Sequence, residues 1–352
     1  MILKETFTKE HIEKIVLQNK CDPIIVERAI VSLGLVEAIS KVGGDFVFKG
    51  GSSLMLLLNN VKRLSTDCDI IVAKEYDIDD LIKKASKLYP FKSVTESIRK
   101  TNNSISKKHY KFIYDSIYNQ NGEVTILLDV LFEDNPYTDL IAIEINNNLL
   151  ICDNNPFFVN CPKIEAILGD KLTAFAPNTT GIKYHNDDFS NDKRLEVVKQ
   201  YYDIVSLISQ AKDFEQIKNN YLSVVKNEIA YRGLNIEYKE VLKDTFNTSL
   251  TILSRGKIGN GNYENLLNGI KKLQNHILIG KYSAEIAALD AADVMLLSAG
   301  LIADIDILNK EIMPQQLFID PTYSKINYIK KLSESTFNKA AYAIRLINNC
   351  LL

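Results

Sequence analysis

The chain has 352 residues, of which 46% are hydrophobic and 24% are charged, and its formal net charge is −2. A chain of this size can bury a substantial core and is long enough for two domains. The near-neutral charge excludes a protein whose whole surface is built to attract nucleic acid. Charged residues occupy the place where a secretory signal would have its apolar centre, and no apolar run is long enough to span a bilayer. We expect a cytoplasmic protein with no membrane partner.

The first half of the chain alternates helical and β-rich patterns. Apolar residues recur at helical spacing in two early segments, and Asp22-Pro23 places a cap residue before a proline at the first position of the second. The spacing predicts helices over 8–18, 24–41, 52–61 and 77–90. Alternating or β-rich runs predict strands over 45–51, 65–72, 107–115 and 123–132, the last two forming an antiparallel hairpin.

The second half is helical almost throughout. Helices are expected over 162–176, 191–210 and much of the chain from 215 onward, with breaks near 256–262 and 312–323. The glycine-rich loop from Arg255 to Gly261 follows no strand, and we interpret it as a helix breaker rather than a phosphate loop. The sequence predicts an α+β protein with domains at 1–212 and 213–352, the second all-helical.

Three aspartates lie in segments that are otherwise strand-like and apolar. Asp67 and Asp69 share one face of their strand, because successive side chains point to opposite faces, and Asp129 interrupts a second apolar strand. Neighbouring carboxylates repel one another, and a divalent cation such as Mg²⁺ or Mn²⁺ offsets that repulsion. The alternative is that Asp67 and Asp69 lie in solvent at a strand end while Asp129 pairs with a lysine.

A glycine turn precedes the first two aspartates. Gly50-Gly51-Ser52 ends one predicted strand and opens a helix, where backbone N–H groups and the helix dipole can hold an anion. A phosphate site one helix away from paired carboxylates predicts a single site for a nucleotide and metal ions. Two metal ions in such a site would activate the attacking oxygen and stabilise the leaving group of a phosphoryl displacement.

With these two elements, "KGGSSL" and "RLSTDCDI", the chain resembles the AbiEii/AbiGii toxins of the DNA polymerase β-like nucleotidyltransferase superfamily. That family carries a Gly-Gly-Ser/Thr turn followed by Arg-x-Ser-x-Asp-x-Asp. Its later element, a Glu and a Lys on one helix and Tyr-Asp on the next, is similar to "IEAILGDKLTAF" and "KQYYDIVSL" here. The similarity covers about 30–210 and places Glu165, Lys171, Tyr202 and Asp203 at the family positions, while Lys199-Gln200 replaces a charged pair.

The resemblance implies a polymerase β-like domain, with a small mixed sheet flanked by helices, that transfers NMP from an NTP to a hydroxyl. It further implies a toxin of a toxin–antitoxin or phage-defence system that acts on RNA, such as the tRNA 3′ end, and that has a cognate antitoxin. Asp67, Asp69 and Asp129 would bind the metal and act in catalysis with Lys171 and Asp203. The nucleotide would be held by Gly50, Gly51, Ser52, Ser53, Arg63, Ser65 and Lys171.

Lys171 and Asp203 are unusual on physical grounds as well. Lys171 falls within the apolar stripe of its helix, three and four residues from Leu168 and Ile167, and Asp203 has apolar neighbours on both sides. A lysine on the buried face of a helix is costly unless it meets an anion or extends its charged end past the core into solvent. The two residues can form a structural ion pair, or Lys171 can reach the triphosphate while Asp203 orients it; both can hold at once.

A basic stretch separates the helix at 77–90 from the hairpin. Nine Lys and Arg residues and one acid lie between Lys83 and Lys111. They can hold an RNA backbone, with Lys100, Lys107 and Lys108 as the expected contacts, or they can serve only to keep the surface solvated. Two other functions remain open from the sequence: transfer to a protein or a small molecule, and nucleotide or antitoxin binding without turnover.

Overall fold

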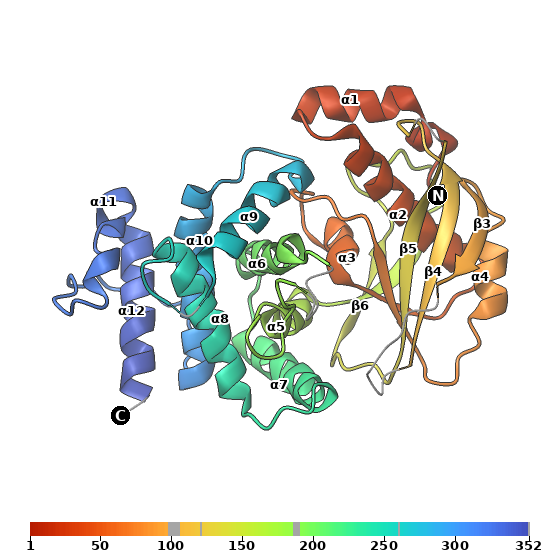
Figure 1. The fold of residues 1–352 in the computed structure, drawn as a ribbon. Coiled ribbons are helices and arrows are strands. Elements are labelled where there is room, and N and C mark those ends of the chain that lie inside the picture. The colour runs from red at the N-terminus through yellow and green to blue at the C-terminus, as the bar shows by residue number, and fades with distance from the viewer. Residues whose placement is uncertain (98–105, 120–121, 186–190, 260, 351–352) are drawn as a thin grey trace. The chain divides into compact units, whose positions relative to one another are not determined.

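The computed structural model of the chain describes residues 1–97, 106–119, 122–185, 191–259 and 261–350, in two compact units. Unit 1 comprises Met1–Lys163 and Asn275–Lys281, and unit 2 comprises Ile164–Gln274 and Tyr282–Leu352. The protein is therefore mixed α/β with helices at its C-terminal end (Figure 1). The contacts divide the chain after Lys163 rather than after residue 212. The sequence-based limits of 1–212 and 213–352 describe where the catalytic domain ends, which this division does not test, and they stay a prediction.

Unit 1 contains the strands and the helices that pack on them. Its helices are α1 (Lys9–Asn19), α2 (Pro23–Lys41), α3 (Gly50–Leu57) and α4 (Asp79–Ala85), preceded by a 3-10 turn at Lys4–Phe7. Its strands are β1 (Val47–Lys49), β2 (Cys68–Val72), β3 (Phe91–Glu96), β4 (Ser106–Asp115), β5 (Glu123–Phe132), β6 (Leu140–Glu144) and β7 (Phe158–Pro162). The Asp22 carboxylate accepts hydrogen bonds from the amides of Ile24 and Ile25, so α2 begins at the predicted proline.

The seven strands form one mixed sheet in the order β3-β4-β5-β2-β1-β7-β6. The pairs β2–β5 and β1–β7 are parallel, and the other neighbours are antiparallel. Alternate residues of β2 and β5, including Cys68, Ile70, Leu128 and Val130, are buried in the core of unit 1, to which α2 also contributes. Asp69 and Asp129 lie on the opposite face and are half-buried. We call this second face the open face.

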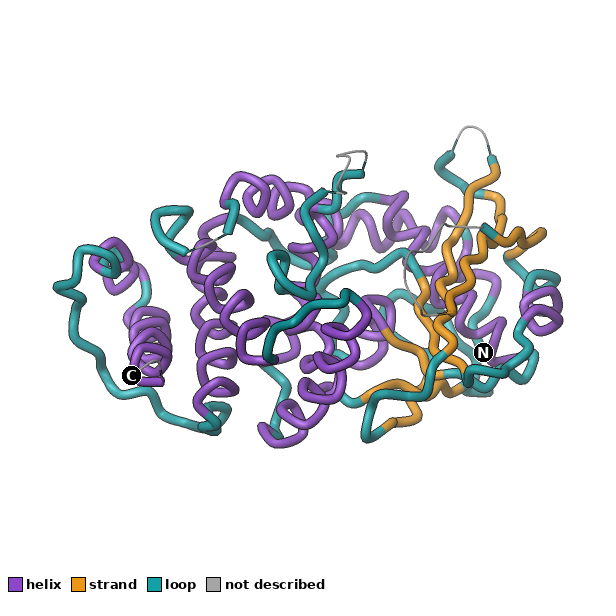
Figure 2. Tube along the Cα trace, turned by 60° about the horizontal axis from the view of Figure 1, so that its bottom comes forward, coloured by secondary structure: helices purple, strands orange, loops and turns teal. Residues whose placement is uncertain are grey.

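The regular elements of unit 2 are all helices in the part of the chain that the structure describes, and loops join them (Figure 2). Its helices are α5 (Ile164–Ala174), α6 (Arg194–Ile208), α7 (Phe214–Tyr231), α8 (Tyr238–Leu253), α9 (Tyr263–Leu273), α10 (Ala284–Ala303), α11 (Ile329–Leu332) and α12 (Glu334–Cys350), with 3-10 turns at Gln274–His276 and Ser324–Ile326. Helix α10 packs between α8 and α12. In the described chain it is the one helix long and apolar enough to cross a membrane, but 72% of its apolar window is buried in the structure, as in the core helix of a globular protein.

The glycine-rich loop after α8 is a helix end, as the sequence predicts. Its inward amides are already used: Gly256 N donates to Thr251 O at 2.8 Å, Ile258 N to Ser254 Oγ at 3.1 Å and Gly261 N to Thr251 Oγ1 at 2.9 Å. These amides are therefore not turned towards a phosphate. The predicted break at 312–323 is also present, since no helix crosses it.

Several predicted elements differ from those observed. Helix α3 ends at Leu57 and α4 at Ala85, each several residues short of the pattern. Three strands, β3, β6 and β7, were not predicted, so the sheet is larger than expected. The β6 sequence Leu140–Glu144 lies at a sheet edge and is largely exposed, which removes the apolar alternation that identifies a strand.

A segment from the helical half of the sequence also belongs to unit 1. Leu64 N donates to His276 O at 2.7 Å, and Leu278 N donates to Lys62 O at 2.8 Å, so 276–278 runs antiparallel to 62–64. Leu278 is fully buried in the core of unit 1. This segment thus braces the chain immediately before β2.

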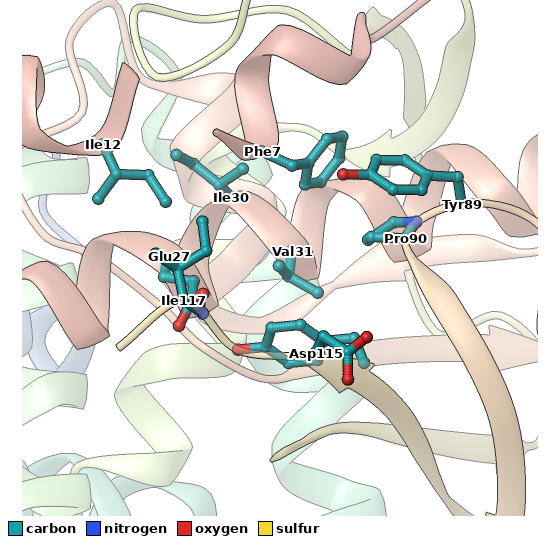
Figure 3. Close-up of a pocket in the computed structure, with 10 residues that line it drawn as sticks. Phe7, Ile12, Glu27, Ile30, Val31, Tyr89, Pro90, Asp115 and Ile117 are labelled. Carbon is teal, nitrogen blue, oxygen red and sulfur yellow. Dashed lines mark hydrogen bonds between the residues drawn. The ribbon is translucent and has the colours of Figure 1, made fainter. Parts of the chain in front are cut away.

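Unit 1 also encloses a cavity of about 30 Å³ that lies beneath α2. Phe7, Tyr89 and Pro90 lie on one side of it and Glu27 and Ile117 on the other (Figure 3). The Glu27 carboxylate accepts hydrogen bonds from Ser116 Oγ and Ile117 N, both at 2.6 Å, and so ties α2 to the end of β4. Small-molecule sites usually measure about 300–1,000 Å³, so this cavity is too small for a nucleotide.

Candidate functional site

Four charged or ionisable residues form one row across the open face of the sheet. The register pairs Lys49 on β1 with Asp69 on β2, Asp69 with Asp129 on β5, and Asp129 with His109 on β4. Residues opposite one another on neighbouring strands lie on the same face with their Cβ atoms about 4.5–5.5 Å apart. The row therefore places two carboxylates side by side, with a lysine on one flank and a histidine on the other.

The Asp129 carboxylate is held by a specific partner. His109 Nδ1 lies 2.7 Å from Asp129 Oδ1, with the His109 side chain 10% exposed and the Asp129 side chain 40% exposed. Between the two aspartates of β2, the Cys68 thiol is fully buried and donates to Ser32 O at 3.1 Å. Burial, and then the nearby Asp69, raise the pKa of this thiol well above its usual range, and its contact with Ser32 lies on the core face, away from the two aspartates.

The glycine turn lies directly against this row. Gly50 has φ +76°, and a Cβ atom added to it would overlap Asp69 Oδ2, with Cγ of the same carboxylate 3.0 Å away. A Cβ atom on Gly51 would lie 2.6 Å from Arg63 Nη2 and 2.8 Å from Ser65 Oγ. The first turn of α3 thus lies against Asp69, Arg63 and Ser65. The combined phosphate and carboxylate site that the sequence predicts here stays a prediction.

Replacing Gly50 by alanine is expected to lower activity at least about 100-fold, because a displaced Asp69 or α3 misaligns the site by about an ångström. Gly43 supplies the matched control: its φ is +86°, but a Cβ atom there meets nothing within 4 Å. Gly43→Ala should therefore keep full activity and lower the free energy of unfolding by only about 1–2 kcal/mol, the cost of placing alanine in the left-handed backbone region. Thermal unfolding and transfer assays on both variants measure this, and equal activities would contradict the close approach.

The serines after the glycines are used within the fold. Ser52 and Ser53 are fully buried; Ser52 Oγ donates to the Asp67 carbonyl and Ser53 Oγ to the Gly50 carbonyl at 2.9 Å. Their hydroxyls therefore fasten α3 to the segment that carries Asp67. Any contact of Ser52 with a phosphate falls to its backbone amide rather than to its hydroxyl.

Arg63 is 8% exposed, and its Nη1 donates to Leu64 O at 3.1 Å. Its backbone is bridged to Ile277 in the bracing segment 276–278. A largely buried guanidinium thus lies next to the glycine turn. The predicted nucleotide-binding roles of Arg63 and Ser65 stay predictions.

The residues present fit a divalent cation, although not as a complete cage. Among the residues described, no group of three or more His, Cys, Asp and Glu side chains is placed to hold a metal ion, so the predicted set of Asp67, Asp69 and Asp129 is not seen as a three-ligand site. Asp69 and Asp129 are direct neighbours, whereas Asp67 lies one residue before β2. Mg²⁺ typically takes one or two carboxylates and completes its shell with water and substrate phosphates, which a carboxylate pair beside a phosphate turn can satisfy.

Lys171 and Asp203 meet inside unit 2. Lys171 Nζ lies 3.0 Å from Asp203 Oδ2, and these side chains are 8% and 3% exposed. Lys171 Nζ also donates to Gln200 Oε1 at 2.7 Å, so Gln200, which departs from the family pattern, helps to fix the lysine. The structural ion pair considered from the sequence is therefore present. Nothing in this geometry tests the nucleotide roles of Lys171 and Asp203, which stay predictions.

Of the three lysines predicted to contact RNA, Lys107 and Lys108 point to opposite faces of β4. Lys108 points to the core face, where its Nζ donates to both Asp79 oxygens at 2.8 and 2.7 Å, and Tyr110 OH donates to Asp79 Oδ1 at 2.5 Å. The hydrogen bond from Lys108, followed by that from Tyr110, lowers the pKa of Asp79. Lys107 is exposed on the open face, in register with Leu131, and Lys100 lies outside the described residues.

Lys49 and His109 belong to the row but were not among the site residues predicted from the sequence. Lys49 directly precedes the glycine turn, and its Nζ also lies 5.5 Å from the Tyr137 ring centroid. His109 lies in an ordinary alternating strand, and only the β4–β5 register places it opposite Asp129. The adjacency of Lys49 to the turn is a cue that the sequence contains. The pairing of His109 depends on the register of the β4–β5 hairpin, which the sequence predicts as a hairpin but without its register.

Comparisons with known proteins give a family match and a similar solved structure. The model of one protein family, described as "Nucleotidyl transferase AbiEii toxin, Type IV TA system", matches residues 35–288. Among solved structures, the chain is similar to an antigenic nucleotidyltransferase-like protein from Paracoccidioides brasiliensis, with 17% identity and a TM-score of 0.37 over 59% of this chain and 89% of that one, a likeness too distant to bear on function. No curated protein sequence matches.

The family match includes the glycine turn, both β2 aspartates, Asp129, Lys171 and Asp203, and it extends over more than two-thirds of the chain. Its nucleotidyl transfer activity agrees with a carboxylate pair set against a phosphate-binding turn. The chain belongs to the AbiEii family of nucleotidyl transferase toxins of type IV toxin–antitoxin systems.

Proposed function

We propose that the protein is a Mg²⁺-dependent (or Mn²⁺-dependent) nucleotidyltransferase that transfers NMP from an NTP to a hydroxyl group of RNA, with the tRNA 3′ end as the acceptor. It would act in the cytoplasm as a toxin restrained by a cognate antitoxin. The observation that carries this proposal is the register pair Asp69–Asp129 lying directly against Gly50. Two like charges at such a position are unfavourable in an empty site and favourable when cations and phosphates are bound.

The residues divide the chemistry as follows. The first turn of α3, with Arg63, would hold the phosphates. Asp69 and Asp129, which are register partners, would hold the metal together with Asp67. A bound Mg²⁺ supplies positive charge that stabilises the reacting phosphoryl group and the pyrophosphate that leaves. The acceptor oxygen forms a bond to the α-phosphorus, the bond from that phosphorus to the pyrophosphate oxygen breaks, and the hydroxyl proton passes to the Asp129 carboxylate.

Lysines on the open face support an anionic acceptor. Lys107 and Lys111 lie two residues on either side of His109 on β4, so all three share the face that carries Asp129. Both lysines are exposed, and neither forms an ion pair with another described residue. The two lysines would thus offset the phosphate charges of a polyanion that lies along β4, beside the carboxylate pair.

Incubating the purified protein with each α-labelled NTP, Mg²⁺ and total cellular RNA tests the proposal. We expect label in RNA, concentrated in the tRNA fraction and dependent on an intact 3′ hydroxyl. Label on protein or on a small molecule would overturn the RNA acceptor but keep the enzyme. Nucleotide binding with no transfer to any acceptor would overturn the enzyme.

Changing Lys107 and Lys111 together to alanine should weaken RNA binding about tenfold. It should also reduce the slope of log affinity against log salt concentration by about 1.4, since each single-strand phosphate contact contributes about 0.7. Lys83 and Lys87 are equally exposed but lie on or directly after α4, which packs on the core face, so their double alanine variant is the matched control. A filter-binding series across salt concentrations measures both, and the same loss in both variants would contradict a specific RNA contact on β4.

A further inference from the structure

His109 is a nearly buried polar side chain in direct contact with a carboxylate of the site. Its Nδ1 lies 2.7 Å from Asp129 Oδ1, and the two residues face one another across the β4–β5 pair. An ionised carboxylate can only accept hydrogen bonds, so Nδ1 is the donor. This direction holds whether the imidazole is neutral or protonated.

The contact with His109 constrains the orientation of the Asp129 carboxylate. Asp129 is 40% exposed on the open face and sits in register with the like-charged Asp69, whose repulsion favours rotation of either carboxylate away from the other. A short hydrogen bond from a side chain that is itself 90% covered fixes which Asp129 oxygen faces β4 and the plane of the carboxylate. The remaining oxygen is then held in a defined direction.

We propose that His109 is a positioning residue of the reaction: it orients the Asp129 carboxylate towards the divalent cation and the acceptor hydroxyl without touching either. This inference rests on the proposed function of Asp129. Carboxylates that bind metals are commonly oriented by such hydrogen bonds from outside the ligand set, and loss of the donor typically costs about 10–100-fold in metal affinity or activity.

The chain contains a histidine with a purely structural contact for comparison. His11 Nε2 lies 2.9 Å from the Leu149 carbonyl, and His11 is also partly buried in unit 1. Replacing either histidine by alanine removes a hydrogen bond of similar length. Only the His109 change removes one from a carboxylate of the site.

The test titrates Mn²⁺ alone into wild-type protein and into the His109→Ala, His109→Asn and His11→Ala variants, with calorimetry as the readout. We expect His109→Ala to weaken Mn²⁺ binding about 10–100-fold. His109→Asn should restore most of the affinity, because its amide NH₂ can donate in place of Nδ1. His11→Ala should lower the midpoint of thermal unfolding without changing Mn²⁺ affinity. In an Asp129→Ala background, the His109 change should have no further effect, since the two residues act as one unit.

The outcomes separate the two claims. Wild-type affinity for Mn²⁺ in a folded His109→Ala variant, with transfer intact, would overturn the positioning role while leaving the proposed function in place. Failure of His109→Asn to restore affinity while both variants fold would also overturn it. A wild-type protein that neither binds Mn²⁺ nor transfers nucleotides would overturn the proposed function itself, and the inference with it.

Discussion

Replacing Asp69 and Asp129 together by asparagine is expected to lower nucleotidyl transfer about 1,000-fold or more. The two carboxylates are register partners beside the glycine turn, and the cation that we propose they hold would be worth several kcal/mol of transition-state stabilisation, where each 1.36 kcal/mol is a factor of ten. The free energy of unfolding should stay equal or rise, because the change removes a like-charge repulsion. Initial-rate assays and urea unfolding measure the two quantities.

A matched control changes the net charge equally at other positions of the same sheet. Asp115 at the end of β4 and Asp134 after β5 are exposed acids that pair with Lys92 and Lys74. Their double asparagine variant should keep wild-type activity, since exposed pairs contribute little to stability. Substantial transfer by the Asp69→Asn, Asp129→Asn protein would contradict this assignment of the site.

Replacing Lys171 by alanine is expected to destabilise the protein by about 3–5 kcal/mol, because it removes one partner of an ion pair whose side chains are only 8% and 3% exposed. Changing both partners, Lys171→Met with Asp203→Leu, should recover most of this loss, since a well-packed apolar pair is often as stable as a buried ion pair. Urea unfolding of both variants and of the exposed-pair control Lys9→Ala measures the effect. A loss in Lys171→Ala no larger than in Lys9→Ala would contradict a buried pair.

The same variants separate structure from catalysis at Lys171. If Lys171 acts only within the ion pair, the stable double variant should transfer nucleotides at the wild-type rate. We expect instead that it folds but has lost most of its activity, because the proposed contact of Lys171 with the triphosphate cannot be made by methionine. Full activity in the double variant would assign both residues a structural role alone.

Features encoded within short stretches of the chain could be predicted. The glycine turn between β1 and α3, the β2 aspartates on one face, and the apolar neighbours of Asp129 and Lys171 all follow from local spacing. The helix end after α8 follows in the same way from its glycines. The assignment of Asp67, Asp69, Asp129, Lys171 and Asp203 to the site rests on these patterns and stays a prediction.

Features set by pairing between distant segments could not be predicted. The register that aligns Lys49, Asp69, Asp129 and His109 joins four strands from separate parts of the chain, and a shift by one residue would turn each side chain to the other face. Lys108 carries the same charge as Lys107, but it is the next residue of β4 and points to the opposite face, where it contacts Asp79. The bracing segment 276–278 is more than 200 residues from its partner 62–64 and has no pattern that marks it.

A nucleotidyltransferase breaks the bond between the α- and β-phosphates of a nucleotide and keeps the nucleotide part on the acceptor. Supplying the protein with its preferred NTP labelled at either the α- or the γ-phosphate, together with RNA and Mg²⁺, tests this directly. We expect label on the acceptor from the α-labelled nucleotide alone and labelled pyrophosphate from the γ-labelled one. Transfer of the γ-label to the acceptor, or release of labelled inorganic phosphate without transfer, would contradict it.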